Sequence, residues 1–218
     1  TQEKFNIPVF STETGYSSAG IDLGSNFFRI NKKVKVAMLI GEGVSSYEAG
    51  EVWHLLDTRV NIPLTKIRLN QFNRTSLDKY TTLVMVSGIY SQISEKDIKK
   101  IKDWVSKGNT LVTIGSASSW AIKKEIVSES LVETKKDSVF SRKRYIDARE
   151  YIGREAIGGS ILSVDLDLTH PLAFGYRDKS IPVYKNNNVF LSKSESQYSS
   201  VALYSNCLLY TYDAADEG

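Results

Sequence analysis

Residues 35–57, KVAMLIGEGVSSYEAGEVWHLLD, decide the fold of this chain. The continuous apolar run at 34–40 predicts a strand that is buried on both faces. The loop 41–43 breaks it, and Ser45 then stands three residues before Glu48, which is the spacing of a capping box. Apolar residues recur after this cap at helical spacing: Ala49, Val52, Trp53 and Leu56. A buried strand followed by a loop and an amphipathic helix is typical of the start of a doubly wound α/β domain.

The same alternation of strands and helices continues along the chain. Further strands are predicted at 64–69, 82–86 and 110–114, and helices at 95–107 and 120–127. Because helices act as the crossovers, this order predicts a mostly parallel sheet with helices on both faces, as in flavodoxin-like folds. Beyond it we expect an apolar stripe at 157–164 and strand-like pieces at 181–184 and 189–191.

The composition excludes several functional classes. The chain has 218 residues, 41% of them hydrophobic and 24% charged, which suits one globular domain with extensions. Its formal net charge of +3 is small and evenly distributed, so we expect neither a nucleic-acid partner nor an anionic membrane. No apolar run approaches the roughly 20 residues of a membrane-spanning helix. The first ten residues show no signal-peptide pattern.

Few residues are available for a metal site or a disulfide. Cys207 is the only cysteine, and His54 and His170 are the only histidines, without HxxE or HExxH spacing. A catalytic zinc ion usually takes three protein ligands, so we expect no zinc site within this chain. Asp165 and Asp167 face the same side if the segment is extended. They are candidates for a cation site or for acid–base work, and equally for turn formation.

The two ends differ in character from the central domain. Residues 1–33 read as a linker or arm, and 34–206 as the α/β domain, with a charged excursion near 128–156. Residues 207–217, CLLYTYDAADE, resemble the translation of a transposase adapter used in sequencing libraries. We interpret 207–218 as adapter read-through and exclude it from functional reasoning. The alternative is a natural strand, LLYTY, followed by an acidic terminus.

Four segments carry a resemblance to a known family. They are GIDLGS at 20–25, GEGVSSYEAGEVWHLLD at 41–57, GNTLVTIGSASSWA at 108–121 and DLTHPLAFGY at 167–176. In this order they resemble the glutamine-amidotransferase-like domain that follows the catalytic domain in a group of large bacterial zinc carboxypeptidases. The similarity runs from about residue 15 to residue 204, and its phrases identify relatives better than they identify chemistry.

The resemblance implies a class I glutamine amidotransferase-like α/β domain within a zinc metallocarboxypeptidase. It implies a parent protein exported from a Gram-negative bacterium, with a periplasmic or extracellular location. The zinc ligands and the catalytic glutamate would then lie upstream of Thr1, so this segment itself needs no cofactor. The implied partners are the upstream peptidase domain of the same polypeptide and the peptide substrate of the parent enzyme.

The turn at 114–118, IGSAS, matches the place where class I glutamine amidotransferases carry a cysteine nucleophile. Gly115 or Ser116 occupies the nucleophile position, depending on the alignment, and no cysteine is present there. The first interpretation is therefore a non-catalytic accessory domain that docks on or supports the peptidase domain. An alternative is a small serine hydrolase or amidotransferase that uses Ser116 with His170 as base. His170 precedes a proline and can equally bond within its own turn.

A third interpretation is a module that binds a small ligand at the carboxyl ends of the strands. Ligands of doubly wound sheets bind at that edge, where loops meet helix N-termini. The candidate residues are Gly41, Glu42, Gly43, Gly88 and Gly115. The sequence GEGVSS is not the dinucleotide fingerprint GxGxxG, and the charge of Glu42 disfavours a phosphate. Tight-turn geometry explains the same glycines without any ligand.

Overall fold

The structure is a computed structural model that describes residues 6, 8–28, 33–132, 144–149, 157 and 159–211, with only the backbone from 206 onward. The chain divides into two compact units, Thr1–Val34 and Lys35–Gly218. Much of the predicted excursion, at 133–143 and 150–156, and the end of the tail at 212–218 lie outside the described residues.

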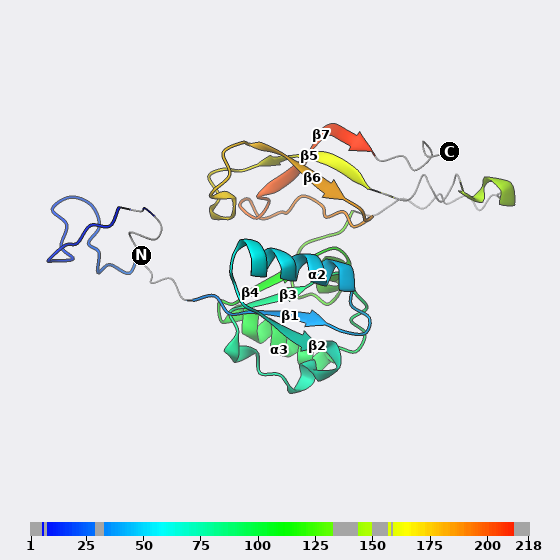
Figure 1. The fold of residues 1–218 in the computed structure, drawn as a ribbon, viewed down its shortest axis with the longest axis horizontal. Helices are drawn as coiled ribbons and strands as arrows, with labels where there is room; N and C mark the ends of the chain where they lie inside the picture. The colour runs from blue at the N-terminus through cyan, green and yellow to red at the C-terminus, as the bar shows by residue number, and fades with distance from the viewer. Residues whose placement is uncertain are drawn as a thin grey trace. The chain divides into compact units, whose positions relative to one another are not determined.

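Four parallel strands form the first sheet, in the order β2-β1-β3-β4 (Figure 1). They are β1 (Val36–Ile40), β2 (Leu64–Arg68), β3 (Thr82–Met85) and β4 (Thr110–Thr113). The central strands β1 and β3 are buried on both faces because their sequences are continuous apolar runs. The predicted α/β class, with a parallel sheet flanked by helices, is therefore confirmed, and all four strands lie where the sequence predicts them.

Three helices cover the two faces of this sheet. They are α2 (Ser46–His54), α3 (Glu95–Ser106) and α4 (Ser116–Lys123). Figure 1 shows α2 on one face and α3 on the other, and the α4 residue Ala117 packs into the same core as α3. Ser45 and Ser94 are the N-caps of α2 and α3, as predicted. Helix α4 begins four residues earlier than the sequence pattern indicates, because it starts directly at the turn after β4.

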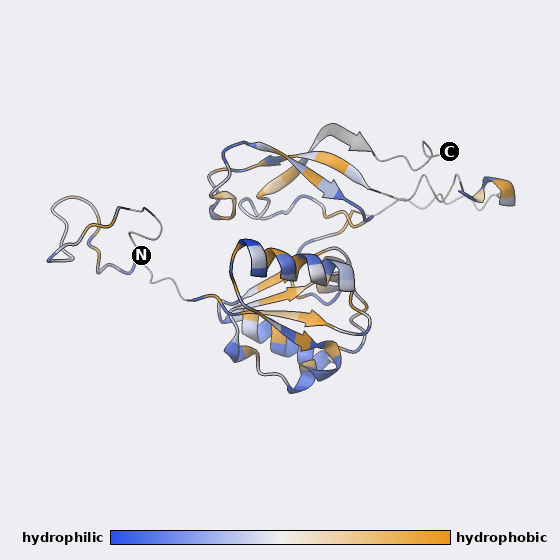
Figure 2. Ribbon diagram, viewed as in Figure 1, coloured by the Kyte–Doolittle hydropathy of each residue, from blue (hydrophilic) through white to orange (hydrophobic). Residues whose placement is uncertain are grey.

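The buried side chains form one cluster on each face of the sheet. The cluster on the α3 face includes Phe72, Leu83, Met85, Ile101 and Trp104. The cluster on the α2 face includes Val36, Met38, Ala49, Val84 and Val86. Figure 2 shows the strands between them as the hydrophobic layer and the outer faces of the helices as hydrophilic. These clusters hold β1, β3 and β4 in register, so that their carboxyl ends meet at one edge.

A second, antiparallel sheet follows in the order β6-β5-β7. Its strands are β5 (Ser160–Leu166), β6 (Ser180–Lys185) and β7 (Ala202–Thr211). The sequence predicts strand-like pieces in this region but assigns them to no sheet. In β6, exposed and partly covered positions alternate, which is the pattern of an antiparallel strand with one covered face. The predicted piece at 189–191 contributes only an isolated bridge between Leu131 and Leu191.

Residues 207–211, which belong to the adapter-like tail, lie in β7. Their backbone pairs with β5, with Leu208 opposite Leu162 and Thr211 opposite Ser160. The pairing is irregular, because the register shifts on both sides of Leu162. This is the backbone that the strand interpretation of LLYTY predicts, and it leaves the origin of the tail to the truncation experiment described below.

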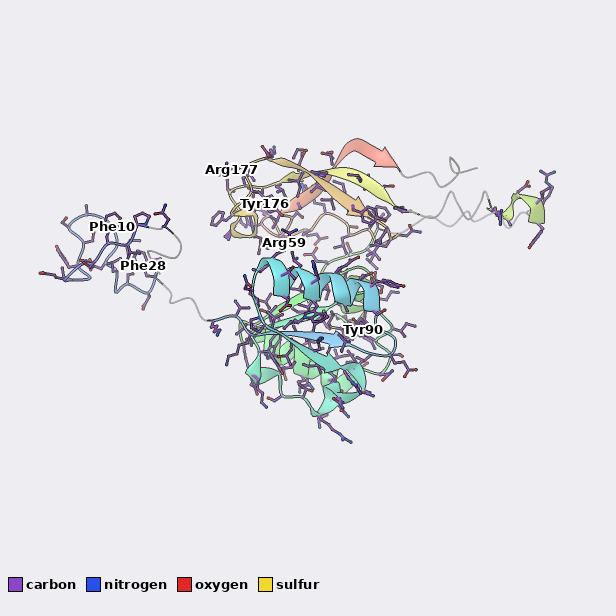
Figure 3. All side chains as sticks on the ribbon, viewed as in Figure 1. Phe10, Phe28, Arg59, Tyr90, Tyr176 and Arg177 are labelled. Carbon is purple, nitrogen blue, oxygen red and sulfur yellow. The ribbon has the colours of Figure 1, made fainter. Side chains whose placement is uncertain are left out.

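The N-terminal unit is held by local turns rather than by regular elements in its described part. The Leu23 N–H donates to the Gly15 carbonyl (2.8 Å), and the Ser17 N–H donates to the Asp22 carboxylate (2.7 Å). Large apolar side chains remain exposed on it, among them Phe10 at 89% (Figure 3). Among all described residues of the chain, no helix is long and apolar enough to span a bilayer.

Candidate functional site

The loops after β1 and β3 are joined to each other at the carboxyl edge of the parallel sheet. The Ile89 N–H donates to the Gly43 carbonyl (2.7 Å), and the Ser45 N–H donates to the Ser87 carbonyl (2.8 Å). A Cβ added to Gly88 would lie 2.9 Å from the Gly43 carbonyl oxygen, so a larger residue cannot stand there without displacing backbone. The structure thus brings these two predicted glycines together, but in a closed contact.

Gly41 and Glu42 are two further residues of the predicted site. Gly41 has a positive φ of 109°, and its nearest neighbours are backbone atoms of Arg68 and Leu69 at the end of β2. Glu42 is exposed and makes no hydrogen bond or ion pair in the described part of the chain. Gly41 lines an apolar groove beside α2, and the other four residues of the predicted site do not line it.

Gly115 stands at the apex of the turn between β4 and α4. Its φ of 56° and ψ of −126° are strained for any residue with a side chain. A sharp, strained strand-to-helix turn is also the device by which hydrolases present a nucleophile. The geometry therefore distinguishes the two alignments: Gly115 occupies the apex, and Ser116 is the first residue of the helix.

The space beside this apex is filled by the hydroxyl of Ser87. A Cβ built on Gly115 would collide with Ser87 Oγ. The same Oγ accepts the backbone N–H of Ser116 at 3.1 Å. In a nucleophile elbow, the N–H that follows the nucleophile donates to the oxyanion of the intermediate. Here that donor already has a partner, and the nucleophile's place holds another residue's hydroxyl.

The side chains of Ser116 and His170 each bond within their own surroundings. Ser116 Oγ accepts the N–H of Gly88 at 2.9 Å. His170 caps the short turn η5 (Pro171–Ala173), and its Nδ1 accepts the N–H of Leu172 at 3.1 Å. Among the described residues no hydrogen bond links Ser116 to His170. The structure does not bring this predicted pair together, and His170 makes the local turn bond that the sequence offered as its alternative.

Glu48 links α2 to the end of β3, a role that the sequence analysis missed. Ser45 Oγ accepts the Glu48 N–H (3.4 Å), but the Glu48 carboxylate does not return to the cap as in a capping box. It accepts the N–H of Ser87 at 2.8 Å instead. The capping-box spacing predicts that the Glu48 carboxylate bonds to the nearby cap. The observed partner is Ser87, 39 positions away, and no local pattern indicates that contact.

Tyr90 completes the polar contacts at this edge (Figure 3). Its hydroxyl is buried and donates to the Val86 carbonyl, and its ring packs against Trp120 with centroids 5.5 Å apart. Burial raises the pKa of the Tyr90 hydroxyl far above its usual range, and the charge of Glu48 adds to the rise. Tyr90 therefore remains a neutral donor, which suits a structural lock rather than proton transfer.

The two aspartates that the sequence offers as candidates, Asp165 and Asp167, have structural roles. Asp167 accepts the N–H (3.0 Å) and the hydroxyl (2.6 Å) of Thr169, and these hydrogen bonds lower the pKa of Asp167. Asp165 lies within β5, opposite Ser180. No group of three or more metal-ligating side chains occurs in the part of the chain that the structure describes. The exposed His54 lies at the end of α2, where its carbonyl accepts the Thr58 hydroxyl.

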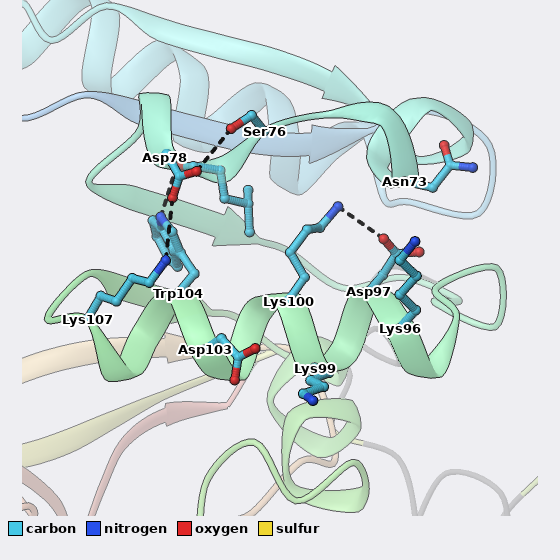
Figure 4. Close-up of a pocket in the computed structure, with 11 residues that line it drawn as sticks. Asn73, Ser76, Asp78, Lys96, Asp97, Lys99, Lys100, Asp103, Trp104 and Lys107 are labelled. Carbon is cyan, nitrogen blue, oxygen red and sulfur yellow. Dashed lines mark hydrogen bonds and ion pairs between the residues drawn. The ribbon is translucent and has the colours of Figure 1, made fainter.

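A charged groove of about 410 Å³ runs along α3, and several of its groups are paired with each other or with the backbone (Figure 4). Lys100 Nζ lies 3.0 Å from Asp97 and donates to the Phe72 carbonyl at 2.8 Å. Trp104 Nε1 donates to the Leu77 carbonyl at 2.9 Å. These bonds fasten the turns η2 (Leu69–Arg74) and η3 (Leu77–Lys79) to the helix. The paired side of the groove is therefore a structural joint between α3 and these turns.

A scan against protein-family models finds no match for this chain, and a search of curated proteins finds no similar sequence. The geometry of the turn after β4 therefore decides what chemistry the site can perform. A glycine stands at the apex of the turn, a serine hydroxyl fills the adjoining space, and the N–H of Ser116 already donates to that hydroxyl.

Proposed function

We propose that this chain is a non-catalytic accessory domain of a larger zinc metallocarboxypeptidase, which docks on or supports an upstream catalytic domain. The observation that carries the non-catalytic part is the filled turn at Gly115, where Ser87 Oγ takes the space of a nucleophile side chain. The family part rests on the resemblance of the segments at 41–57 and 108–121. We further propose a flavodoxin-like fold, which the strand order β2-β1-β3-β4 supports.

The filled turn argues against acyl-transfer chemistry for three separate reasons. A nucleophile needs a side chain at the apex, and Gly115 has none. An oxyanion needs free donors, and the Ser116 N–H donates to Ser87. A serine needs a base within about 3 Å, whereas the His170 imidazole is bonded to the N–H of Leu172. Loss of one oxyanion donor alone costs on the order of 10²- to 10³-fold in rate.

The proposed docking role is supported by apolar side chains that this chain leaves exposed. In the N-terminal unit, Phe10, Tyr16, Phe27 and Phe28 are each more than half exposed. Tyrosine and other aromatic side chains are enriched at interfaces, and such a cluster on one short segment marks a contact surface. We propose that this segment packs on the catalytic domain of the exported parent, which would hold the zinc ion.

The DNA upstream of Thr1 tests this proposal. We expect the reading frame to continue upstream into a domain with the HxxE spacing and a further histidine, the ligand set of a zinc carboxypeptidase. The purified chain alone should hold no stoichiometric zinc by elemental analysis and should release no C-terminal residue from peptides. An upstream frame that encodes an unrelated domain would overturn the family assignment. One tightly bound zinc per chain would overturn the proposal that the zinc site lies in the upstream domain.

A further inference from the structure

Helix α2 leaves an apolar groove open between itself and the edge strand β2. The groove has a volume of about 500 Å³, within the range of small-molecule sites. Its principal lining residues are Met38, Ile40, Ala49, Gly50, Trp53 and Lys66. The loop residues Gly41, Val44 and Ser45 close one end of the groove, next to the contact between Gly43 and Gly88.

Gly50 is the first residue that indicates a ligand-binding role for this groove. It lies in the interior of α2, where glycine destabilises a helix by about 1 kcal/mol relative to alanine. Its φ is not positive, and a Cβ added there would meet no atom within 4 Å. Neither backbone conformation nor packing within the described residues requires a glycine. Because glycine has no side chain, the wall of the groove stays open at this position.

Lys66 is the second sign, and it is independent of the first. In the register of the parallel pair, Lys66 stands directly opposite Met38, so both side chains lie on the α2 face of the sheet. Its Nζ lies 3.6 Å from the centroid of the Trp53 ring. No acidic side chain within the described ranges pairs with it, in contrast to Lys100 and Lys124. A lysine fixed over an aromatic ring at the rim of an apolar groove offers one positive charge without a partner.

We propose that this groove binds a small carboxylate that carries an apolar group. The apolar group fills the space left by Gly50, between Trp53 and the floor formed by Met38. The carboxylate pairs with Lys66 Nζ at the rim. The same chemistry occurs in a free arylalkanoic acid and in the C-terminal residue of a peptide with an aromatic side chain. This inference does not depend on the proposed accessory function.

The test uses 3-phenylpropionate and, as a neutral probe of the same size, 3-phenylpropanol, each titrated into the full chain by NMR. We expect saturable binding of the carboxylate, with shifts at Gly50 and Trp53. Lys66→Met should lower the affinity for 3-phenylpropionate by about tenfold. It should change the affinity for 3-phenylpropanol by less than about twofold, because only the charge interaction is lost. Lys99→Met is the matched control: it removes an exposed lysine from α3 and should change neither affinity.

A second pair of variants separates binding from stability. Gly50→Leu should weaken both probes by about tenfold or more, because the added side chain occupies the groove. Gly50→Ala should raise the melting temperature, since it removes a helix-interior glycine without a clash. Acetyl-Gly-Phe, with a free or an amidated C-terminus, distinguishes a peptide end from a free acid. The proposal is overturned if 3-phenylpropionate shows no saturable binding, or if its affinity is unchanged by both Lys66→Met and Gly50→Leu.

Discussion

The parallel sheet and the antiparallel sheet of this chain bury different kinds of side chain. In the parallel sheet, the central strands contribute apolar residues such as Leu39 and Leu83, both fully buried. In the antiparallel sheet, the buried residues include Ser163 and Lys185 beside Val164. The first region has an apolar core between two helical layers, and the second has a thin core that retains polar groups. Packing stability should therefore be concentrated in the first region.

Lys185 illustrates the difference. Its Nζ donates to the Val189 carbonyl (2.7 Å) and to the Asn187 side chain (3.2 Å), and it lies 4.3 Å from the centre of the Phe190 ring. Desolvation lowers the pKa of Lys185, and no carboxylate among the described residues pairs with it. A buried ammonium satisfied by neutral oxygens orders the strand end but adds little net stability.

The largest expected effect compares equivalent truncations in the two sheets. Leu83→Ala, in the centre of β3, should lower the free energy of unfolding by about 3 to 4 kcal/mol. Leu166→Ala, in β5, removes the same side chain and should lower it by only about 2 kcal/mol, because the core around this buried leucine is thinner. Urea denaturation followed by circular dichroism measures both. Equal losses would show that the two sheets contribute alike to stability.

The next effect concerns the turn that connects the parallel sheet to α4. Gly115→Ala should cost about 3 kcal/mol, from the positive φ together with the clash on Ser87 Oγ. When Ser87→Ala is already present, the clash is gone and the cost should fall to about 1 to 2 kcal/mol. A double-mutant cycle by denaturant unfolding gives the coupling. Strictly additive effects would mean that Ser87 does not fill this space.

A smaller effect is the pH dependence that Asp97 gives to the α3 joint. Desolvation disfavours its ionised form, but hydrogen bonds from Ser94 and Lys100 and the charge of Lys100 outweigh it and lower the pKa of Asp97. A depressed carboxyl pKa in the folded state gives stability that is present above the unfolded pKa of about 4 and is lost as the pH falls through the folded value. Melting temperatures of wild type and Asp97→Asn should therefore differ at pH 6, and the difference should shrink as the pH falls below about 4. A constant difference would assign the effect to packing.

The smallest expected effect is that of the tail. If 207–218 is adapter read-through, it was never selected to pack, although its first residues continue β7. A chain that ends at Asn206 should then keep its melting temperature within error. A loss of several degrees, equivalent to about 1 kcal/mol or more, would show that the irregular pairing with β5 stabilises the antiparallel sheet.

The sequence predicted the parallel sheet because its signals are local. Continuous apolar strands, the serine caps at Ser45 and Ser94, and the apolar stripe of α3 each act within a few residues. The antiparallel sheet was not predicted because β5 pairs with β6 and β7, on either side of it, through residues far apart in sequence. Its alternation is also short and interrupted by serines.

The candidate site was predicted in part for the same reason. The turn residues Gly88 and Gly115 follow directly after strands, so the pattern placed both at the right edge of the sheet. Ser87 and Glu48 were missed because their roles depend on contacts to residues 28 or more positions away. Nothing in the local sequence distinguishes a serine that fills a turn from one that ends a strand.

The central claim is that the turn at Gly115 is filled and inert, and fluorophosphonate labelling tests it most directly. The full chain is incubated with the probe, and each serine is examined by mass spectrometry. The filled turn predicts no labelling of Ser116 or Ser87 above the level of the heat-denatured protein. Among the described residues neither hydroxyl is bonded to a histidine, and the Ser116 N–H already donates to Ser87. Stoichiometric labelling at Ser116 that is abolished by His170→Ala would contradict it and would establish a serine hydrolase.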